Sequence, residues 1–223
     1  IYYMFGERHR QRPDPDRRYD RIYVGGDYGQ QNATTFQAFG LDTYRKKLPG
    51  LGEYYHSGRD TGKQKSPSEY AKDLVTFLDE LHERYDTRIF YIFLDPSAKG
   101  LAEEIRRATR TGLDYKVLMR DAENDVALGI SRVQKLLTFD IMSISPDQEN
   151  ATDEFGTYEY DKKSIEKGNE VPVKEKDHCM DAIRYCVMGA WDRVKHWLPK
   201  EYQKEEIDIC DISKKEVTDD EYF

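Results

Sequence analysis

The chain has 223 residues, 38% of them hydrophobic and 35% charged, and 35 basic against 43 acidic side chains give a net charge of −8. This length suits one substantial α/β domain and hardly two. No run of about 18 apolar residues exists, which excludes a transmembrane helix and argues against a membrane partner. The negative charge disfavours coating of nucleic acid by charge alone, but it is compatible with an enzyme that uses metal ions and a local basic rim.

The ends of the chain and its cysteines indicate a cytoplasmic fragment. Residues 1–5 lack the features of a signal peptide, and the absence of an initial Met indicates a piece of a longer protein. The cysteines Cys179, Cys186 and Cys210 lack the spacing of metal ligands. We therefore expect free thiols in a reducing cytoplasm, and no zinc.

The first part of the chain predicts a linker followed by strands. Residues 1–20 are rich in Arg, Asp and Pro and are expected to form an extended lead-in. Strand-like runs follow at residues 21–27, 34–41 and 54–56, which together predict a meander.

Helices and strands alternate after residue 65. Ser66-Pro67-Ser68-Glu69 has the chemistry of a helix start, and the apolar stripe that follows has helical spacing: Tyr70, Leu74, Phe77, Leu78 and Leu81. The apolar run at 88–95 predicts a strand buried on both faces. Further predicted elements are a helix at 99–110, a strand at 115–119, a helix at 124–138, a β-hairpin within 155–175 and a helix from 177 to 191. This order predicts an α/β domain over residues 21–198 with a mixed central sheet flanked by helices, followed by a charged tail at 199–223.

Three aspartates lie where apolar elements begin or end. Asp27 closes the first strand, Asp95 closes the most apolar strand, and Asp181 lies early in the last helix. Each one alone is explained more simply as a strand-end cap or a helix-terminus charge. Two parallel strand ends and a helix packed beside them can, however, bring the three carboxylates together, and such a pocket suits Mg²⁺ or Mn²⁺.

His178 is three residues before Asp181, so both would share one face of the last helix. It would bind a metal through nitrogen or position an attacking water, with a surface or capping role as the alternative. Asp177 is expected to cap this helix or to complement its positive end. Asn124 is expected to cap the helix at 124–138 and is left out of the catalytic set.

These residues occur in segments that resemble a known family. Gly26-Asp27-Tyr28-Gly29 with Thr34-Thr35-Phe36, then Leu94-Asp95-Pro96-Ser97, and then the run from Asp177 to Tyr185 (DHCMDAIRY) resemble the nuclease domain of phage terminase large subunits. The resemblance spans about residues 20–190. It implies a ribonuclease H-like fold, two Mg²⁺ or Mn²⁺ ions, and cleavage of concatemeric double-stranded viral DNA for packaging.

The resemblance also implies residue roles and partners. It assigns metal binding and catalysis to Asp27, Asp95 and Asp181, with His178 beside them, and it implies that the hairpin lies against the DNA. The implied partners are double-stranded DNA, the terminase ATPase domain, the small terminase subunit and the portal protein, in the cytoplasm of a bacterial host. Removal of Asp27 or Asp181 is expected to abolish cutting and to leave the fold intact. Six basic residues are candidates for phosphate contacts, although a solvated surface explains each one as well: Arg106, Arg107, Arg110, Lys162, Lys163 and Lys167.

One feature of the family is missing, and two other functions remain open. The nearest approach to a phosphate-binding loop is Gly58 to Gln64, whose glycines are one residue too close and whose last residue is not Ser or Thr. An ATPase motor is therefore not expected in these residues. The alternatives are a phosphotransferase of the actin and sugar-kinase superfamily, which ATP binding would favour, and a non-catalytic module that docks other packaging proteins.

Overall fold

The computed structural model describes residues 1–29 and 32–203. In these residues, six strands form one mixed sheet in the order β5-β4-β1-β2-β3-β6. The strands are β1 (Ile22–Tyr28), β2 (Ala33–Gly40), β3 (Leu48–Ser57), β4 (Ile89–Leu94), β5 (Lys116–Asp121) and β6 (Met142–Ser143). β1, β2 and β3 form an antiparallel meander, β4 and β5 run parallel to β1, and β6 runs parallel to β3. The predicted mixed sheet is confirmed, and β6 is a strand that the sequence pattern did not indicate.

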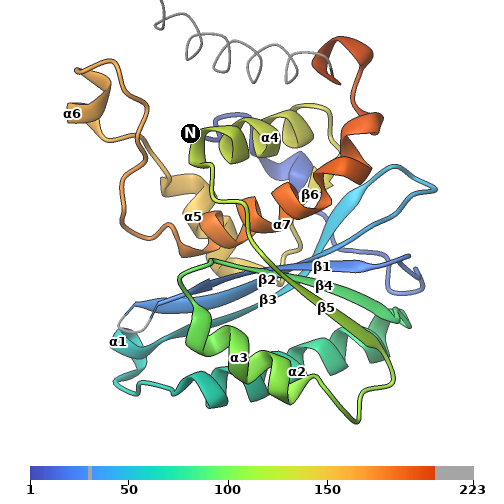
Figure 1. Cartoon of the computed structure of the whole chain (residues 1–223). Helices are drawn as coiled ribbons and strands as arrows, with labels where there is room; N and C mark the ends of the chain where they lie inside the picture. Colours follow the sequence, from blue (N-terminus) through green and yellow to red (C-terminus); the bar gives the residue numbers. More distant parts are fainter. Residues whose placement is uncertain (30–31, 204–223) are drawn as a thin grey trace, which may run out of the picture.

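Helices cover both faces of the sheet (Figure 1). α2 (Pro67–Tyr85) and α3 (Lys99–Ala108) lie on one face, and α4 (Val126–Thr138), α5 (Glu149–Thr157) and α7 (His178–Val194) lie on the other. The remaining helices are short: α1 (Gly58–Thr61), α6 (Lys162–Ile165), and the 3₁₀ helices η1 (Glu7–His9) and η2 (Lys195–Trp197). The sheet separates the hydrophobic core into two parts. Successive side chains of β1 point to opposite faces, so Ile22 and Val24 face α2 and α3 whereas Tyr23 faces α7.

α2 forms as its sequence predicts. The Ser66 hydroxyl accepts a hydrogen bond from the Glu69 backbone N–H at 3.3 Å, and the Glu69 carboxylate accepts one from the Ser66 N–H at 2.8 Å. Pro67 occupies the first turn, where a missing N–H costs nothing. All five residues of the predicted apolar stripe are buried: Tyr70, Leu74, Phe77, Leu78 and Leu81.

Two glycines let α7 approach the sheet closely. A Cβ atom at Gly25 of β1 would lie 1.8 Å from the backbone oxygen of Ala182, and one at Gly189 of α7 would lie 2.2 Å from the ring of Phe93. Any larger residue at either position would push the helix away from β1 and β4. Because neither glycine has a side chain, α7 packs close to the sheet, and its first turn lies beside the end of β1.

The lead-in at residues 1–20 packs against the domain. Tyr2 is buried and stacks on Tyr158 at 5.8 Å between ring centroids. His9 is buried as well, and its backbone oxygen accepts a hydrogen bond from the Ile144 N–H at 2.8 Å. Most of the predicted tail at 199–223 lies outside the described residues, as does Cys210. The other two cysteines, Cys179 and Cys186, are free and buried as expected.

The predicted β-hairpin within residues 155–175 is wrong. Phe155 belongs to α5, where it stacks on Phe5 at 4.3 Å between ring centroids. Residues 158–177, here called the arm, contain the one-turn helix α6, and their two sides form only an isolated bridge between Tyr160 and Pro172. Two backbone hydrogen bonds flank this bridge, from the Asp161 N–H to the Val171 oxygen and from the Val173 N–H to the Glu159 oxygen, and α6 occupies the place of further pairs. Within residues 1–29 and 32–203, no helix combines the length and apolar character that crossing a membrane requires.

Candidate active site

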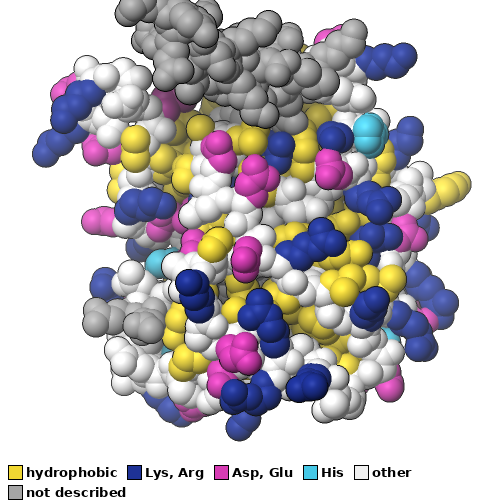
Figure 2. Space-filling model, viewed as in Figure 1, with side chains coloured by type: hydrophobic (Ala, Val, Ile, Leu, Met, Phe, Trp, Pro, Cys, Tyr) yellow, Lys and Arg dark blue, Asp and Glu magenta, His cyan; other side chains and the backbone are white. Residues whose placement is uncertain are grey.

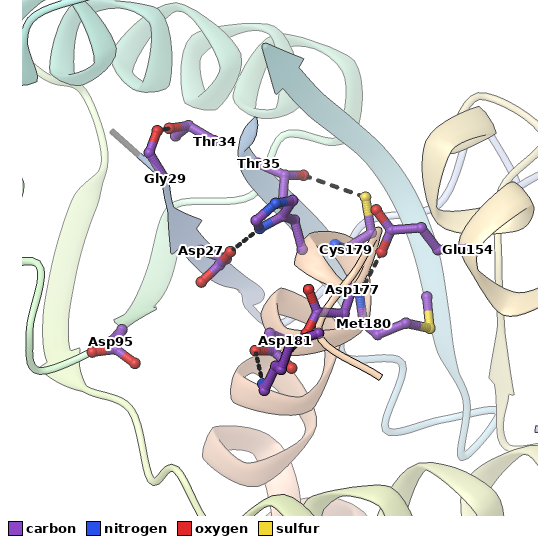
Figure 3. A network of polar contacts seen from close by, with 12 residues as sticks. Asp27, Gly29, Thr34, Thr35, Asp95, Glu154, Asp177, Cys179, Met180 and Asp181 are labelled. Atoms are coloured by element: carbon purple, nitrogen blue, oxygen red, sulfur yellow. Dashed lines mark hydrogen bonds and ion pairs between the residues drawn. The ribbon is translucent and has the colours of Figure 1, made fainter. Parts of the chain in front are cut away.

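Asp27 and Asp95 occupy corresponding positions on neighbouring parallel strands. Gly26 of β1 is paired with Leu94 of β4, and the two aspartates are the next residues along each strand. Neighbouring strands lie about 4.8 Å apart, so the two carboxylates start from adjacent points at the carboxyl end of the sheet. Asp181 lies in the first turn of α7, near the same edge of the sheet. Figure 3 shows Asp27, Asp95 and Asp181 together at this edge.

Asp27 is held by His178. The Nδ1 atom of His178 lies 2.7 Å from Oδ2 of Asp27, so the imidazole donates a hydrogen bond to the carboxylate (Figure 3). Burial raises the pKa of Asp27, and although His178 opposes this shift, the nearby Asp181 adds to it. The hydrogen bond to Asp27 in turn raises the pKa of His178. The ionised form of Asp27 is therefore incompletely compensated by the protein, which favours the presence of a cation.

Asp181 is paired with two cations. Its Oδ1 accepts a hydrogen bond from Nη2 of Arg184 at 2.6 Å, and its Oδ2 lies 3.4 Å from Nζ of Lys174. The Arg184 side chain is fully buried, whereas Lys174 extends from the base of the arm and also contacts Asp177 at 3.3 Å. The arm is thus tied by an ion pair to the same helix turn that carries Asp181.

Asp95 is surrounded by three hydrogen-bond donors. Its Oδ1 accepts from the Ser97 backbone N–H at 2.7 Å, and its Oδ2 lies 3.0 Å from the Tyr185 hydroxyl and 3.3 Å from Nδ2 of Asn124. Burial opposes ionisation of Asp95, but the hydrogen bonds from Ser97 and Tyr185 outweigh it and lower the pKa. Asp95 is therefore kept as an anion, in contrast to Asp27.

Asn124 was assigned wrongly from the sequence. The helix cap of α4 is Asp125, whose carboxylate accepts a hydrogen bond from the Leu128 N–H at 2.9 Å. This leaves the Asn124 amide free to contact Asp95 and the Tyr185 hydroxyl. The sequence did hold a signal for this, because Asn124 directly precedes Asp125, and an Asp at that position can itself cap the helix.

The start of α7 is capped by a residue from another helix. Asp177 does not cap it with its side chain. Instead, Oε2 of Glu154 on α5 accepts hydrogen bonds from the N–H groups of Cys179 at 2.7 Å and Met180 at 3.1 Å (Figure 3). Glu154 is only 5% exposed. Sequence reasoning missed this residue because the contact joins positions 25 residues apart. Glu154 fixes the turn from which His178 and Asp181 project.

The buried position of Glu154 predicts a specific pH dependence. Burial raises its pKa from 4.5 to about 7, although its hydrogen bonds to α7 oppose the shift. The folded state therefore holds a proton that the unfolded state has lost, and the stability of the wild type should fall as pH rises from about 4.5 to 7. In Glu154→Gln, which keeps an acceptor oxygen but cannot ionise, the free energy of unfolding should fall by about 3 kcal/mol less over this pH range than in the wild type. Urea unfolding of both proteins at a series of pH values measures it, and parallel profiles would contradict the prediction.

All three aspartates influence the pKa of one hydroxyl group, that of Tyr185. Burial raises the pKa of the Tyr185 hydroxyl, and Asp181, Asp27 and Asp95 each raise it further. The Tyr185 hydroxyl therefore lies in the negative electrostatic field of all three carboxylates. Oxygen donors of this kind fit Mg²⁺ or Mn²⁺ in their chemistry. In the conformation described for residues 1–29 and 32–203, however, no three His, Cys, Asp or Glu side chains are close enough to share an ion. Each aspartate is turned towards a protein partner instead.

The predicted basic residues lie in two separate places. Lys162 and Lys163 are in α6, which Figure 1 shows projecting away from the sheet, and Lys167 follows it. Arg106 and Arg107 are in the last turn of α3, and Arg110 follows closely. All six side chains are exposed.

Comparisons with known proteins agree on one family. The family model described as "Terminase RNAseH like domain" matches residues 27–188. The large terminase of a thermophilic bacteriophage, solved in complex with ATP-gamma-S, is 34% identical over 83% of this chain, with a TM-score of 0.72, and the match covers 44% of that protein. This chain thus spans less than half the length of that large terminase. No curated protein matches the chain.

Two isolated nuclease domains have the same fold. The P22 large terminase nuclease domain is 16% identical, with a TM-score of 0.63, and the match covers 85% of this chain and 91% of that one. The large terminase nuclease of the thermophilic phage G20c, which was solved with bound magnesium, is 19% identical, with a TM-score of 0.50 and coverage of 80% and 89%. The ribonuclease H-like fold expected from the sequence is confirmed.

Proposed function

Because the chain belongs to the family of terminase ribonuclease H-like domains, we propose that it is a metal-dependent endonuclease that cuts concatemeric double-stranded viral DNA during packaging. The observation that carries the proposal is the adjacency of Asp27 and Asp95 at the ends of paired strands, with Asp181 entering from α7. The family membership sets aside the phosphotransferase alternative. A docking module without catalysis would leave the convergence of these carboxylates unexplained.

Asp27, Asp95 and Asp181 would hold two Mg²⁺ or Mn²⁺ ions, with His178 as a neighbouring ligand or as the residue that orients Asp27. When bound, the ions would supply an activated water and neutralise charge on the phosphate that is cut. Tyr185 and Asn124 orient Asp95 through their contacts at 3.0 and 3.3 Å. Glu154 holds the helix turn that carries His178 and Asp181. Such outer contacts fix the direction of a ligand and tune its basicity.

The domain would act together with other packaging proteins. A terminase ATPase domain, a small terminase subunit and a portal protein are the proposed partners, in the cytoplasm of a bacterial host. In that setting the arm, with its lysines at α6, would face the DNA.

Digestion of supercoiled plasmid tests the proposal directly. The domain is incubated with Mg²⁺, with Mn²⁺ or with EDTA, and nicked and linear products are separated on a gel. We expect cutting with either metal and none with EDTA, because the bound ions would supply the activated water and neutralise charge on the phosphate that is cut. A folded domain that cuts with neither metal would contradict an autonomous nuclease and favour the docking module.

A further inference from the structure

A second charged region lies at the opposite end of the sheet from the aspartates. A cavity of about 720 Å³ opens beside the edge strand β5, and four basic residues line it: Arg88, Arg106, Arg110 and Lys116. Asp114 is the only acidic residue among the lining side chains. The apolar part of the wall includes Val117 and Met119. Figure 2 shows Lys and Arg side chains over α3 and beside β5, with apolar atoms between them.

These cations have few partners within the protein. Arg106 lies 3.8 Å from Glu103, and both side chains are more than half exposed, so this pair is weak. Within residues 1–29 and 32–203, no ion pair joins Arg88, Arg110 or Lys116 to a carboxylate. Their charge is therefore available to an anionic ligand, in a chain whose net charge is −8.

The position of the cavity relates it to the aspartates. Arg88 directly precedes β4, whereas Asp95 directly follows it, so the two regions are separated by at least the length of that strand. The cavity lies on the side of the sheet that α3 covers, around the edge strand β5 from the aspartates. Six residues of strand span about 20 Å, which is the rise of about 6 base pairs of duplex DNA. On the intervening α3, Lys99 lies at the start and Arg106 and Arg107 lie at the end, with Glu103 and Glu104 between them. Arg107 is paired with Glu104 at 2.9 Å, so the cations that remain available are those at the cavity. A duplex bound at the aspartates is long enough to reach the cavity as well, which favours an extended polyanion over a separate short acidic peptide.

We propose that the basic cavity binds phosphate groups of the duplex about half a helical turn away from the phosphate at the aspartates. This inference rests on the proposed function, since it takes duplex DNA as the substrate. Guanidinium groups of Arg106 and Arg110 are suited to paired hydrogen bonds with phosphate oxygens. The cavity would supply the local basic rim that an acidic nuclease needs, and it would favour long duplexes over short ones.

Binding of labelled duplexes in EDTA tests the cavity apart from cleavage. Fluorescence anisotropy is measured at a series of salt concentrations for the wild type, for Arg106→Gln/Arg110→Gln, and for the charge-matched control Arg193→Gln/Lys200→Gln. Arg193 lies in the last turn of α7, and Lys200 follows η2. Each lost phosphate contact lowers the slope of log K against log salt by about 0.9, so we expect a slope reduced by about 2 in the cavity variant. The control should keep the slope of the wild type.

The possible results distinguish DNA binding at the cavity from DNA cleavage at the aspartates. An unchanged slope for the cavity variant overturns the proposal even if the domain cuts plasmid. An equal reduction in the control variant overturns it too, because the effect would then be one of net charge. A reduced slope in a domain that does not cut would support the cavity and contradict only the proposed nuclease.

Discussion

Asp181→Ala is expected to lower the free energy of unfolding by about 3 kcal/mol, because it leaves the Arg184 guanidinium buried without its carboxylate. Arg184 is fully buried, and its Nε and Nη1 atoms already have no hydrogen-bond partner among the described residues. The ion pair of 2.6 Å with Asp181 is the charge compensation that its position provides. The sequence alone led to the expectation that Asp181 can be removed without cost to the fold, and the structure gives the reason to expect otherwise.

Two companion variants isolate this cause. Asp181→Asn keeps an acceptor oxygen for Arg184 and should lose less stability than Asp181→Ala. Asp181→Ala/Arg184→Met removes both charges and should recover most of the loss, since apolar residues often replace a buried ion pair at little cost. Urea unfolding followed by circular dichroism measures all three variants. If Asp181→Ala is as stable as the wild type, Arg184 does not depend on this pair.

Asp27→Asn is expected to lower the rate of plasmid cutting by more than about 100-fold, because loss of even an outer-shell partner of a metal ligand costs roughly 10- to 100-fold. Stability should not fall, since burial already opposes the charge of Asp27 and the asparagine oxygen can still accept the hydrogen bond from His178. The measurement is the cutting rate with Mn²⁺, together with urea unfolding of the same preparation.

His178→Ala serves as the comparison for Asp27. It removes the donor that orients Asp27 but leaves the carboxylate, so we expect a smaller loss of activity, within about 10- to 100-fold. An Asp27→Asn protein that is folded and cuts at the wild-type rate would remove Asp27 from the active site. Unchanged cutting by His178→Ala would make the histidine a bystander.

The elements with strong local signals could be predicted from the sequence. The capping box at Ser66 and the apolar stripe of α2 were visible because both depend on residues within one or two turns of each other. The ends of β1 and β4 were visible as apolar runs that stop at an aspartate, and the parallel pairing of these strands places Asp27 beside Asp95.

The contacts between distant segments could not be predicted in this way. Alternation of Tyr158 and Tyr160 resembles a strand, but packing of Phe155 on Phe5 selects a helix just before them. Glu154 and the Asn124–Asp95 contact depend on how α5 and α4 are placed in three dimensions. Patterns along the chain describe an element and its faces, whereas such contacts depend on tertiary packing.

The seating of α7 on β1 has a consequence for how this sequence can vary. At Gly25 the helix rests directly on the strand backbone, with no side chain between them. Where side chains separate two elements, exchanging a large residue for a small one shifts their spacing. At this contact no such residue exists, so the distance of Asp27 from the helix that carries Asp181 is set by backbone contact and not by the size of a side chain.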